Sequence, residues 1–333
     1  MKNDTFPWQA IAWSEFLRAW QGERLGHALL IEGPEGLGKL QLAFRIAAQV
    51  LGAAWTPAEP PLPPRHADLL WLTLEEGEKG PRQQIGVQQV RDACATLAMT
   101  SYTGGWKAAV IAPAERLTLA AANALLKTLE EPAPRTLIVL VRSRLDTLPA
   151  TVASRCQRLR LAAPPEDAAL AWLDRNFPGR PWRRLLELAG GAPLLAVRLA
   201  DRGYAELDAA FADDLLAILA GRADPLEIAA SWQRRELPDV LRWLDIWTSS
   251  LVRLKAAGRP PALENAKQRA LQTALERIPL QRLYRYLDEV HGAAARLDGA
   301  LNAQLMLESL LTPWPDQLEP LTGAATQGLL ADR

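Results

Sequence analysis

The chain has 333 residues, 49% of them hydrophobic and 23% charged, which is typical of a folded globular protein and too long for one ordinary core. Lys and Arg total 38, as do Asp and Glu, which excludes the global positive field of an unspecific binder of duplex DNA. The chain has only two cysteines, which excludes a disulfide framework. It contains no run of about 18 apolar residues, the length that a membrane span requires. We therefore expect a cytoplasmic protein.

A glycine-rich loop lies between a predicted strand at 27–31 and a segment with apolar residues at helical spacing. The run Gly33 to Lys39 fits the pattern G-x-x-x-x-G-K. At this position, backbone N–H groups and a helix N-terminus can cradle phosphate. We assign Gly33, Gly36, Gly38 and Lys39 to a candidate nucleotide site.

Two positions that should hold a metal ion are altered. The glycine loop is followed by Leu40, where ATPases of this type have a Ser or Thr hydroxyl that helps to hold Mg²⁺. Ala112 and Pro113 end a predicted strand at the place of an acidic pair, and Glu115 lies too far beyond it to replace that pair. We predict negligible ATP hydrolysis. Weak residual binding of ATP or ADP and an empty structural turn both stay open.

Further apolar runs at 68–74, 108–112 and 136–141 are predicted to be buried strands. Helical patterns at 87–98 and 121–129 separate them, and prolines end the second pattern. Strands that alternate with helices predict a parallel sheet covered on both faces.

Strand patterns end after residue 161 and helical periodicity continues, which makes the fold class α/β plus all-α. We predict a nucleotide-binding-fold module at 1–163, a small helical lid at 164–203, a helical bundle at 204–320 and a tail at 321–333. Trp243 and Trp247 lie one turn apart, so we expect them to pack inside the bundle rather than to stack on bases.

Two segments carry a resemblance to a known family. The run Asn-Ala-Leu-Leu-Lys-Thr-Leu-Glu-Glu-Pro from Asn123 to Pro132, and the triplet Ser154-Arg155-Cys156, resemble the clamp-loader branch of the AAA+ proteins. Within that branch, the damaged nucleotide site is similar to that of the delta prime subunits of bacterial DNA polymerase III. The resemblance covers essentially the whole chain and implies an AAA+ module, a helical lid and a C-terminal collar for assembly.

The resemblance also implies a role for Arg155. In the family, this arginine projects into the ATP site of a neighbouring ATPase subunit, and an arginine supplied in trans raises the rate about 10³- to 10⁵-fold in GTPases. The alternative is that it is one of several surface arginines, with Arg142, Arg144, Arg158 and Arg160.

The partners that the resemblance implies are ATPase subunits of the gamma/tau type and a delta subunit in a hetero-pentameric ring, together with the sliding clamp and primed DNA. The chain is then expected to complete the ring without hydrolysing ATP. The alternative is an active P-loop ATPase subunit.

The same resemblance bears on DNA and metals. It places Lys127 beside a central DNA chamber, as a possible phosphate contact on an otherwise ordinary amphipathic helix. Relatives usually carry a zinc module after the glycine-loop helix, but 51–66 has no cysteine, so we expect no zinc.

Two smaller assignments complete the site. Arg142-Ser143-Arg144 stands where a polar sensor of the γ-phosphate is expected, which again indicates a retired site. We assign Cys156 to packing.

Overall fold

The computed structural model describes residues 6–58, 60–77, 80–81, 84–143, 148–219, 221–257, 278–295 and 302–313. Two units are formed. The first contains the described residues up to Ala168 together with Ala192–Leu195, and the second contains Ala169–Gly191 and the described residues from Ala196 onward. The division at 163, 203 and 320 stays a prediction, and the predicted tail lies outside the described residues.

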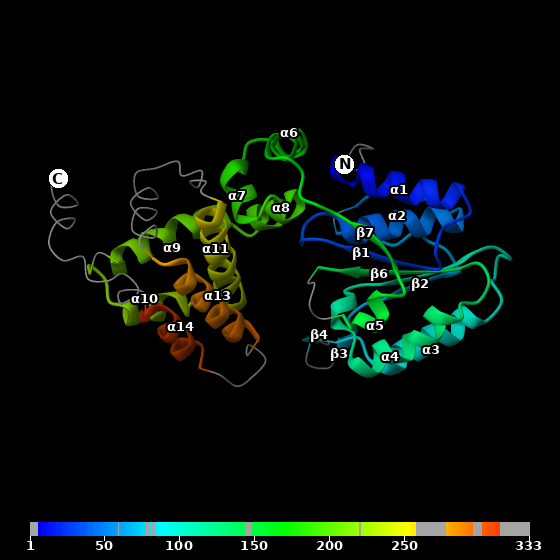
Figure 1. Cartoon of the computed structure of the whole chain (residues 1–333). Helices are drawn as coiled ribbons and strands as arrows, with labels where there is room; N and C mark the ends of the chain where they lie inside the picture. Colours follow the sequence, from blue (N-terminus) through cyan, green and yellow to red (C-terminus); the bar gives the residue numbers. More distant parts are fainter. Residues whose placement is uncertain are drawn as a thin grey trace. The chain divides into compact units, whose positions relative to one another are not determined.

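A five-stranded parallel sheet forms the centre of the first unit (Figure 1). Its strands, in spatial order, are β2 (Leu69–Leu72), β5 (Lys107–Ile111), β6 (Thr136–Arg142), β1 (Ala28–Glu32) and β7 (Gln157–Arg160). The three central strands are buried at every residue, which explains why they read as continuous apolar runs. The predicted parallel sheet and its four predicted strands are confirmed.

The sequence analysis missed the strands that lack an apolar run. In the edge strand β7 only Leu159 is buried, and charged or polar residues flank it. A short antiparallel hairpin of β3 (Glu76–Gly77) and β4 (Gly80–Pro81) was also not predicted. Strand β7 has too few buried side chains for periodicity to reveal it, and β3 and β4 are only two residues long each.

Helices cover both faces of the sheet. Figure 1 shows α1 (Ala10–Gln21) and α2 (Lys39–Leu51) on one face and α3 (Val87–Ala98) and α4 (Leu119–Glu130) on the other. Helix α1 was not predicted, whereas α3 and α4 confirm the predicted helices. Helix α4 begins where the hydroxyl of Thr118 accepts a hydrogen bond from the N–H of Ala121, at 3.1 Å.

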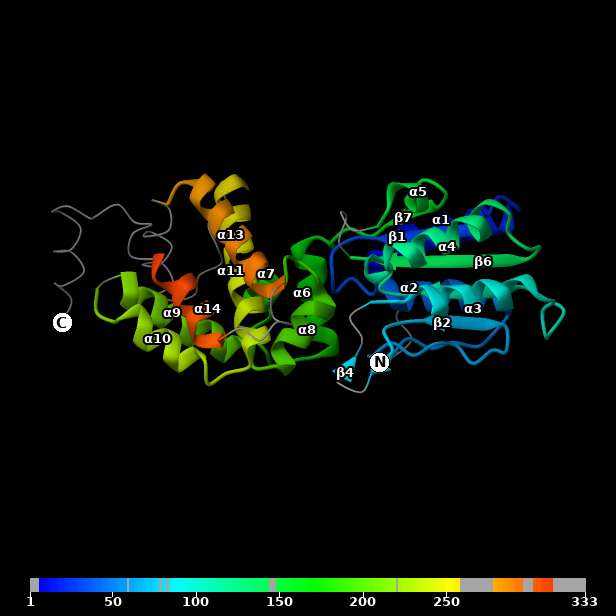
Figure 2. The same cartoon turned by 90° about the horizontal axis from the view of Figure 1, so that it is seen from below.

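The second unit consists of helices. They are α6 (Glu166–Asn176, which begins in the first unit), α7 (Trp182–Leu188), α8 (Pro193–Asp201, which also begins in the first unit), α9 (Tyr204–Leu219), α10 (Pro225–Trp232), α11 (Leu237–Ala257), α13 (Leu280–Ala295) and α14 (Ala303–Leu311). Figure 2 shows α11 and α13 side by side, and these two helices are packed together. Prolines 225, 238 and 279 stand in or just before the first turn of a helix, where proline is favoured.

Buried tryptophans form the core of the helical unit. Trp243 is fully buried, its ring stacks on that of Trp247 with centroids 5.4 Å apart, and Phe211 packs edge-on against it at 4.7 Å. The indole N–H of Trp243 donates to Asp208, which also pairs with Arg184 at 2.7 Å. The expected internal packing is confirmed. None of the helices that the structure describes is long and apolar enough to cross a membrane.

A buried carboxylate organises the loop between α3 and β5. Asp68, 4% exposed, accepts hydrogen bonds from the hydroxyls of Thr103 (2.8 Å) and Ser101 (3.0 Å) and from the N–H groups of Tyr102 and Thr103. Burial acts to raise its pKa, but the bonds from Thr103, Tyr102 and Ser101 outweigh burial and lower the pKa to about 2. Asp68 therefore stays charged at neutral pH.

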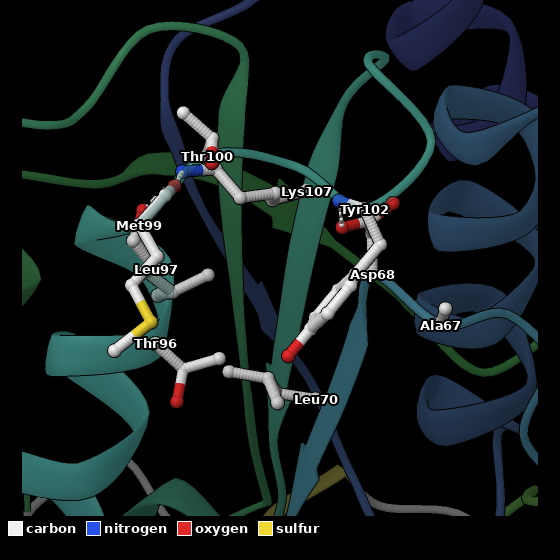
Figure 3. Close-up of a pocket in the computed structure, with 9 residues that line it drawn as sticks. All are labelled: Ala67, Asp68, Leu70, Thr96, Leu97, Met99, Thr100, Tyr102 and Lys107. Atoms are coloured by element: carbon white, nitrogen blue, oxygen red, sulfur yellow. Dashed lines mark hydrogen bonds between the residues drawn. The ribbon is translucent and has the colours of Figure 1, made fainter.

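A small cavity lies beside this carboxylate (Figure 3). Its volume is about 20 Å³, and Asp68, Leu70, Met99 and Lys107 are among its lining residues. It lies where β2 and β5 begin, at the edge of the parallel sheet opposite to the glycine loop. The space accommodates about one water molecule and no nucleotide.

We predict that Asp68→Asn lowers the free energy of unfolding at pH 7 by about 2 kcal/mol, because it removes charge-assisted hydrogen bonds. The pKa is lower in the folded than in the unfolded chain, so this stabilisation is present above 3.8, its ordinary value, and is lost as the pH falls towards about 2. Urea unfolding between pH 7 and pH 2 measures both effects. The exposed Asp92→Asn on α3 is the control, and equal effects of the two variants would contradict the prediction.

Candidate functional site

The glycine loop joins the carboxyl end of β1 to the first turn of α2, as the sequence predicts. Gly36 and Gly38 have φ angles of 80° and 75°, a left-handed conformation that favours glycine. Both glycines are buried, so the loop is covered at these two positions.

The N-terminal segment covers one side of the loop. In the short 3₁₀ helix η1 (Pro7–Gln9), the Gln9 side chain is 2% exposed and donates to the carbonyls of Leu37 (2.9 Å) and Gly38 (2.8 Å). The indole N–H of Trp8 also donates to the carbonyl of Leu37, at 2.9 Å. A Cβ on Gly38 would lie 2.6 Å from the amide nitrogen of Gln9, so these side chains pack directly against the loop backbone.

The segment Ala192–Leu195 covers the loop at Gly36. The N–H of Leu194 donates to the carbonyl of Gly36 at 3.1 Å. A Cβ on Gly36 would lie 2.4 Å from the Cβ of Leu195, closer than two carbon atoms can approach. Only glycine therefore fits here, for packing reasons that are independent of any nucleotide.

The lysine of the loop turns inward. Lys39 is 5% exposed, and its ammonium group donates to the carbonyl of Pro34 at 2.5 Å, within the same loop. Leu40 follows it, half-buried and without a group that can bind a metal ion. The assigned residues Gly33, Gly36, Gly38 and Lys39 thus form one loop, whose lysine already has an internal acceptor.

The end of β5 offers no acidic pair. Ala112 is buried, and Pro113 leads into the short helix η2 (Ala114–Arg116). Glu115 accepts a hydrogen bond from the backbone N–H of Ser143, at 3.0 Å, and so connects the ends of β5 and β6. Within the described ranges, no group of three or more His, Cys, Asp or Glu side chains could hold a metal ion.

A buried ion pair lies at the base of the loop. Glu32, the last residue of β1, is 3% exposed and accepts from Arg142 at 2.5 Å and from Arg160 at 2.8 Å. Burial acts to raise the pKa of Glu32, but the hydrogen bonds from Arg160 and Arg142 lower it overall. The carboxylate thus connects the ends of β6, β1 and β7, the three adjacent strands that meet at the glycine loop.

Arg142, at the predicted sensor position, takes part in this ion pair and so has a structural role. Arg142 is the last residue of β6 and is 6% exposed, with its guanidinium directed to Glu32. Arg144 lies outside the described residues. Sequence analysis missed Glu32, although a carboxylate at the end of a fully apolar strand is itself a signal of a buried partner.

Arg155 lies at the surface after the short helix α5 (Ala150–Ala153). Its side chain is 37% exposed, donates to the carbonyl of Thr151 at 2.8 Å and pairs with Glu130 at 2.5 Å. The structure therefore brings together the two sequence segments that carry the family resemblance.

Lys127 and Cys156 are the two remaining assigned residues. Lys127 is exposed on α4, while Leu125 and Leu129 on the opposite face are buried, as the amphipathic pattern predicts. Burial raises the pKa of the Cys156 thiol to about 11, and the side chain packs against the core of the first unit. The packing role of Cys156 is confirmed, and a reactive thiolate is not indicated.

Both parts of the chain match families of DNA polymerase III. The model described as "DNA polymerase III, delta subunit" matches residues 8–165, and "DNA polymerase III, delta subunit, C terminal" matches residues 209–316. DNA polymerase III subunit delta' of Pseudomonas aeruginosa is 33% identical, over 93% of this chain and 97% of its own length. The protein of the same name from Haemophilus influenzae is 32% identical, over 75% of this chain and 78% of its own length.

A DNA polymerase III gamma subunit-related protein from Thermotoga maritima aligns with 91% of this chain and 98% of its own, with a TM-score of 0.47 and 20% identity.

We predict that Glu32→Gln destabilises the first unit by about 3 kcal/mol, because it removes one partner of a buried ion pair. Hydrogen exchange of the β1 and β6 amides measures the opening free energy of this unit separately from the helical unit. The control is Arg160→Gln, whose 73% exposed side chain should contribute about 1 kcal/mol or less. Similar protection in wild type and Glu32→Gln would show that the ion pair is not needed.

Proposed function

Because this chain belongs to the family of DNA polymerase III delta prime subunits, we propose that it is a clamp-loader subunit that does not hydrolyse ATP itself. In this proposal it completes a hetero-pentameric ring with gamma/tau and delta subunits in the cytoplasm. The ring opens the sliding clamp and loads it on primed DNA during chromosome replication. The chain's contribution is an arginine, Arg155, which it supplies to the ATP site of a neighbouring ATPase subunit.

The proposal rests on one contrast between two parts of the chain. Side chains cover the backbone of its phosphate loop at Gly36 and Gly38, whereas the side chain of Arg155 is accessible. Phosphoryl transfer depends on a positioned metal ion and on charge neutralisation. Here Leu40 and Ala112 stand at metal positions, and Lys39 donates to Pro34. The guanidinium of Arg155 is held at the surface, from which it can reach an oxyanion on another subunit.

The proposal extends to nucleotide and DNA. The packing of Gln9 and Leu195 against the loop supports a loop that stays empty of ATP and ADP. No cofactor, zinc included, is required in this proposal. Exposed Lys127 is a candidate for a phosphate contact once the ring surrounds DNA.

We predict that the isolated chain gives no heat of binding when it is titrated with ATP or ADP at millimolar concentration, with Mg²⁺ present. The physical reason is that the loop lacks metal ligands and its lysine already has an acceptor. Isothermal titration calorimetry measures this directly. Saturable, Mg²⁺-dependent binding would contradict the prediction and favour the active-ATPase alternative.

The donor role of Arg155 is tested in a clamp loader reconstituted from its purified subunits. We expect Arg155→Ala to assemble normally and to slow hydrolysis at the neighbouring site by about 10³-fold, within the range known for arginines supplied in trans. Single-turnover measurements with clamp and primed DNA resolve this site. Arg158→Ala, a nearby exposed arginine on β7, is the control and should leave the rate unchanged.

The outcomes distinguish an arginine donor from an active ATPase subunit. A chain that is inert alone, with a complex that is slowed by Arg155→Ala and not by Arg158→Ala, supports the donor role. Hydrolysis by the isolated chain, or equal rates for Arg155→Ala and wild type, rejects it.

A further inference from the structure

We infer that Glu130 is a positioning residue for Arg155 and sets the direction in which the guanidinium leaves the surface. This inference rests on the proposed function of Arg155 as an arginine supplied to a neighbouring subunit. It assigns a task to one carboxylate of the Leu-Glu-Glu-Pro run, which the resemblance alone does not explain.

The contacts of Arg155 fix its guanidinium at two points. One terminal nitrogen donates to the carbonyl of Thr151 at 2.8 Å, and the other pairs with a carboxylate oxygen of Glu130 at 2.5 Å. A guanidinium has five N–H donors in one plane, so two fixed donors define that plane and three stay available. These three donors can bind an oxyanion while Glu130 and Thr151 keep their bonds.

Both partners of Arg155 lie next to buried residues. Leu129, next to Glu130, is 1% exposed, and its carbonyl lies 2.6 Å from Nε2 of His27. Val152, next to Thr151, is fully buried, and α5 packs against α4. The guanidinium of Arg155 is therefore connected to the core through the residues next to two buried side chains.

The position of Glu130 in its helix favours a cationic partner. Glu130 is the last residue of α4, where the negative end of the helix dipole disfavours a carboxylate. The cation of Arg155 offsets this unfavourable interaction. Glu131 follows directly, also exposed, and has no ion pair within the described part of the chain, which makes it a matched control.

Positioning and sequestration of the arginine predict opposite results. Without Glu130 a positioned Arg155 samples more rotamers and binds the transition state less often, which lowers the rate. A sequestered arginine would instead be released, which raises the rate. Exposed ion pairs are weak, and a phosphoryl group is the stronger acceptor for Arg155, so we expect positioning.

The test uses the complete reconstituted clamp loader with this chain as wild type, Glu130→Gln, Glu131→Gln, Arg155→Ala or the double variant of Glu130→Gln and Arg155→Ala. We measure kcat and KM for ATP in the presence of clamp and primed DNA, and we check assembly by size-exclusion chromatography. We expect Glu130→Gln to lower kcat about 2- to 5-fold, the scale of an exposed ion pair, with KM unchanged. Glu131→Gln should match wild type.

The double variant distinguishes positioning from a general effect on folding. If Glu130 acts through Arg155, the double variant is no slower than Arg155→Ala alone. A further loss in the double variant, an effect of Glu131→Gln equal to that of Glu130→Gln, or a gain in kcat overturns the inference. If Arg155→Ala lowers the rate and Glu130→Gln does not, only the role of Glu130 fails, whereas an unchanged rate with Arg155→Ala rejects the proposed function itself.

Discussion

The buried ion pair between Glu32 and Arg142 is the constraint on which the first unit depends. Three parallel strands end at this point, and the pair keeps the opposite charges of Glu32 and Arg142 together where both side chains are buried. Arg160 supplies a second cation from the edge strand and accounts for part of the lowered pKa of Glu32. At this edge of the sheet, the protein's own side chains bring opposite charges together.

The closed loop and the accessible arginine are two consequences of the same fold. A strand, a glycine turn and a helix still form the phosphate loop, but Gln9, Trp8 and Leu195 pack against its backbone. The short helix before Arg155 is anchored in the same core as α4, so the arginine is held in one place. The glycine loop thus keeps the strand, turn and helix of its fold while side chains cover its backbone.

Sequence periodicity predicted the buried elements and failed at the edges. The strands at 27–31, 108–112 and 136–141 were found because every side chain in them is apolar or faces a dry interior. Strand β7 was missed because it has one buried residue. Motif spacing identified the glycine loop and the Ser-Arg-Cys triplet. It did not reveal that Glu130 and Arg155 are partners, since they are 25 positions apart in sequence numbering.

The sequence by itself determined the order of the buried strands and of the helices between them, the absence of metal-binding side chains at Leu40 and Ala112, and the membership of the delta prime family. These properties are local or depend on residue identity, so a linear chain contains them. Only the tertiary structure decided that Lys39 turns to Pro34, that Glu32 joins Arg142 and Arg160, and that Glu130 meets Arg155. Each of these contacts depends on which partner lies nearest to a charged side chain. The nearest partner is determined by how segments that are distant in sequence pack together.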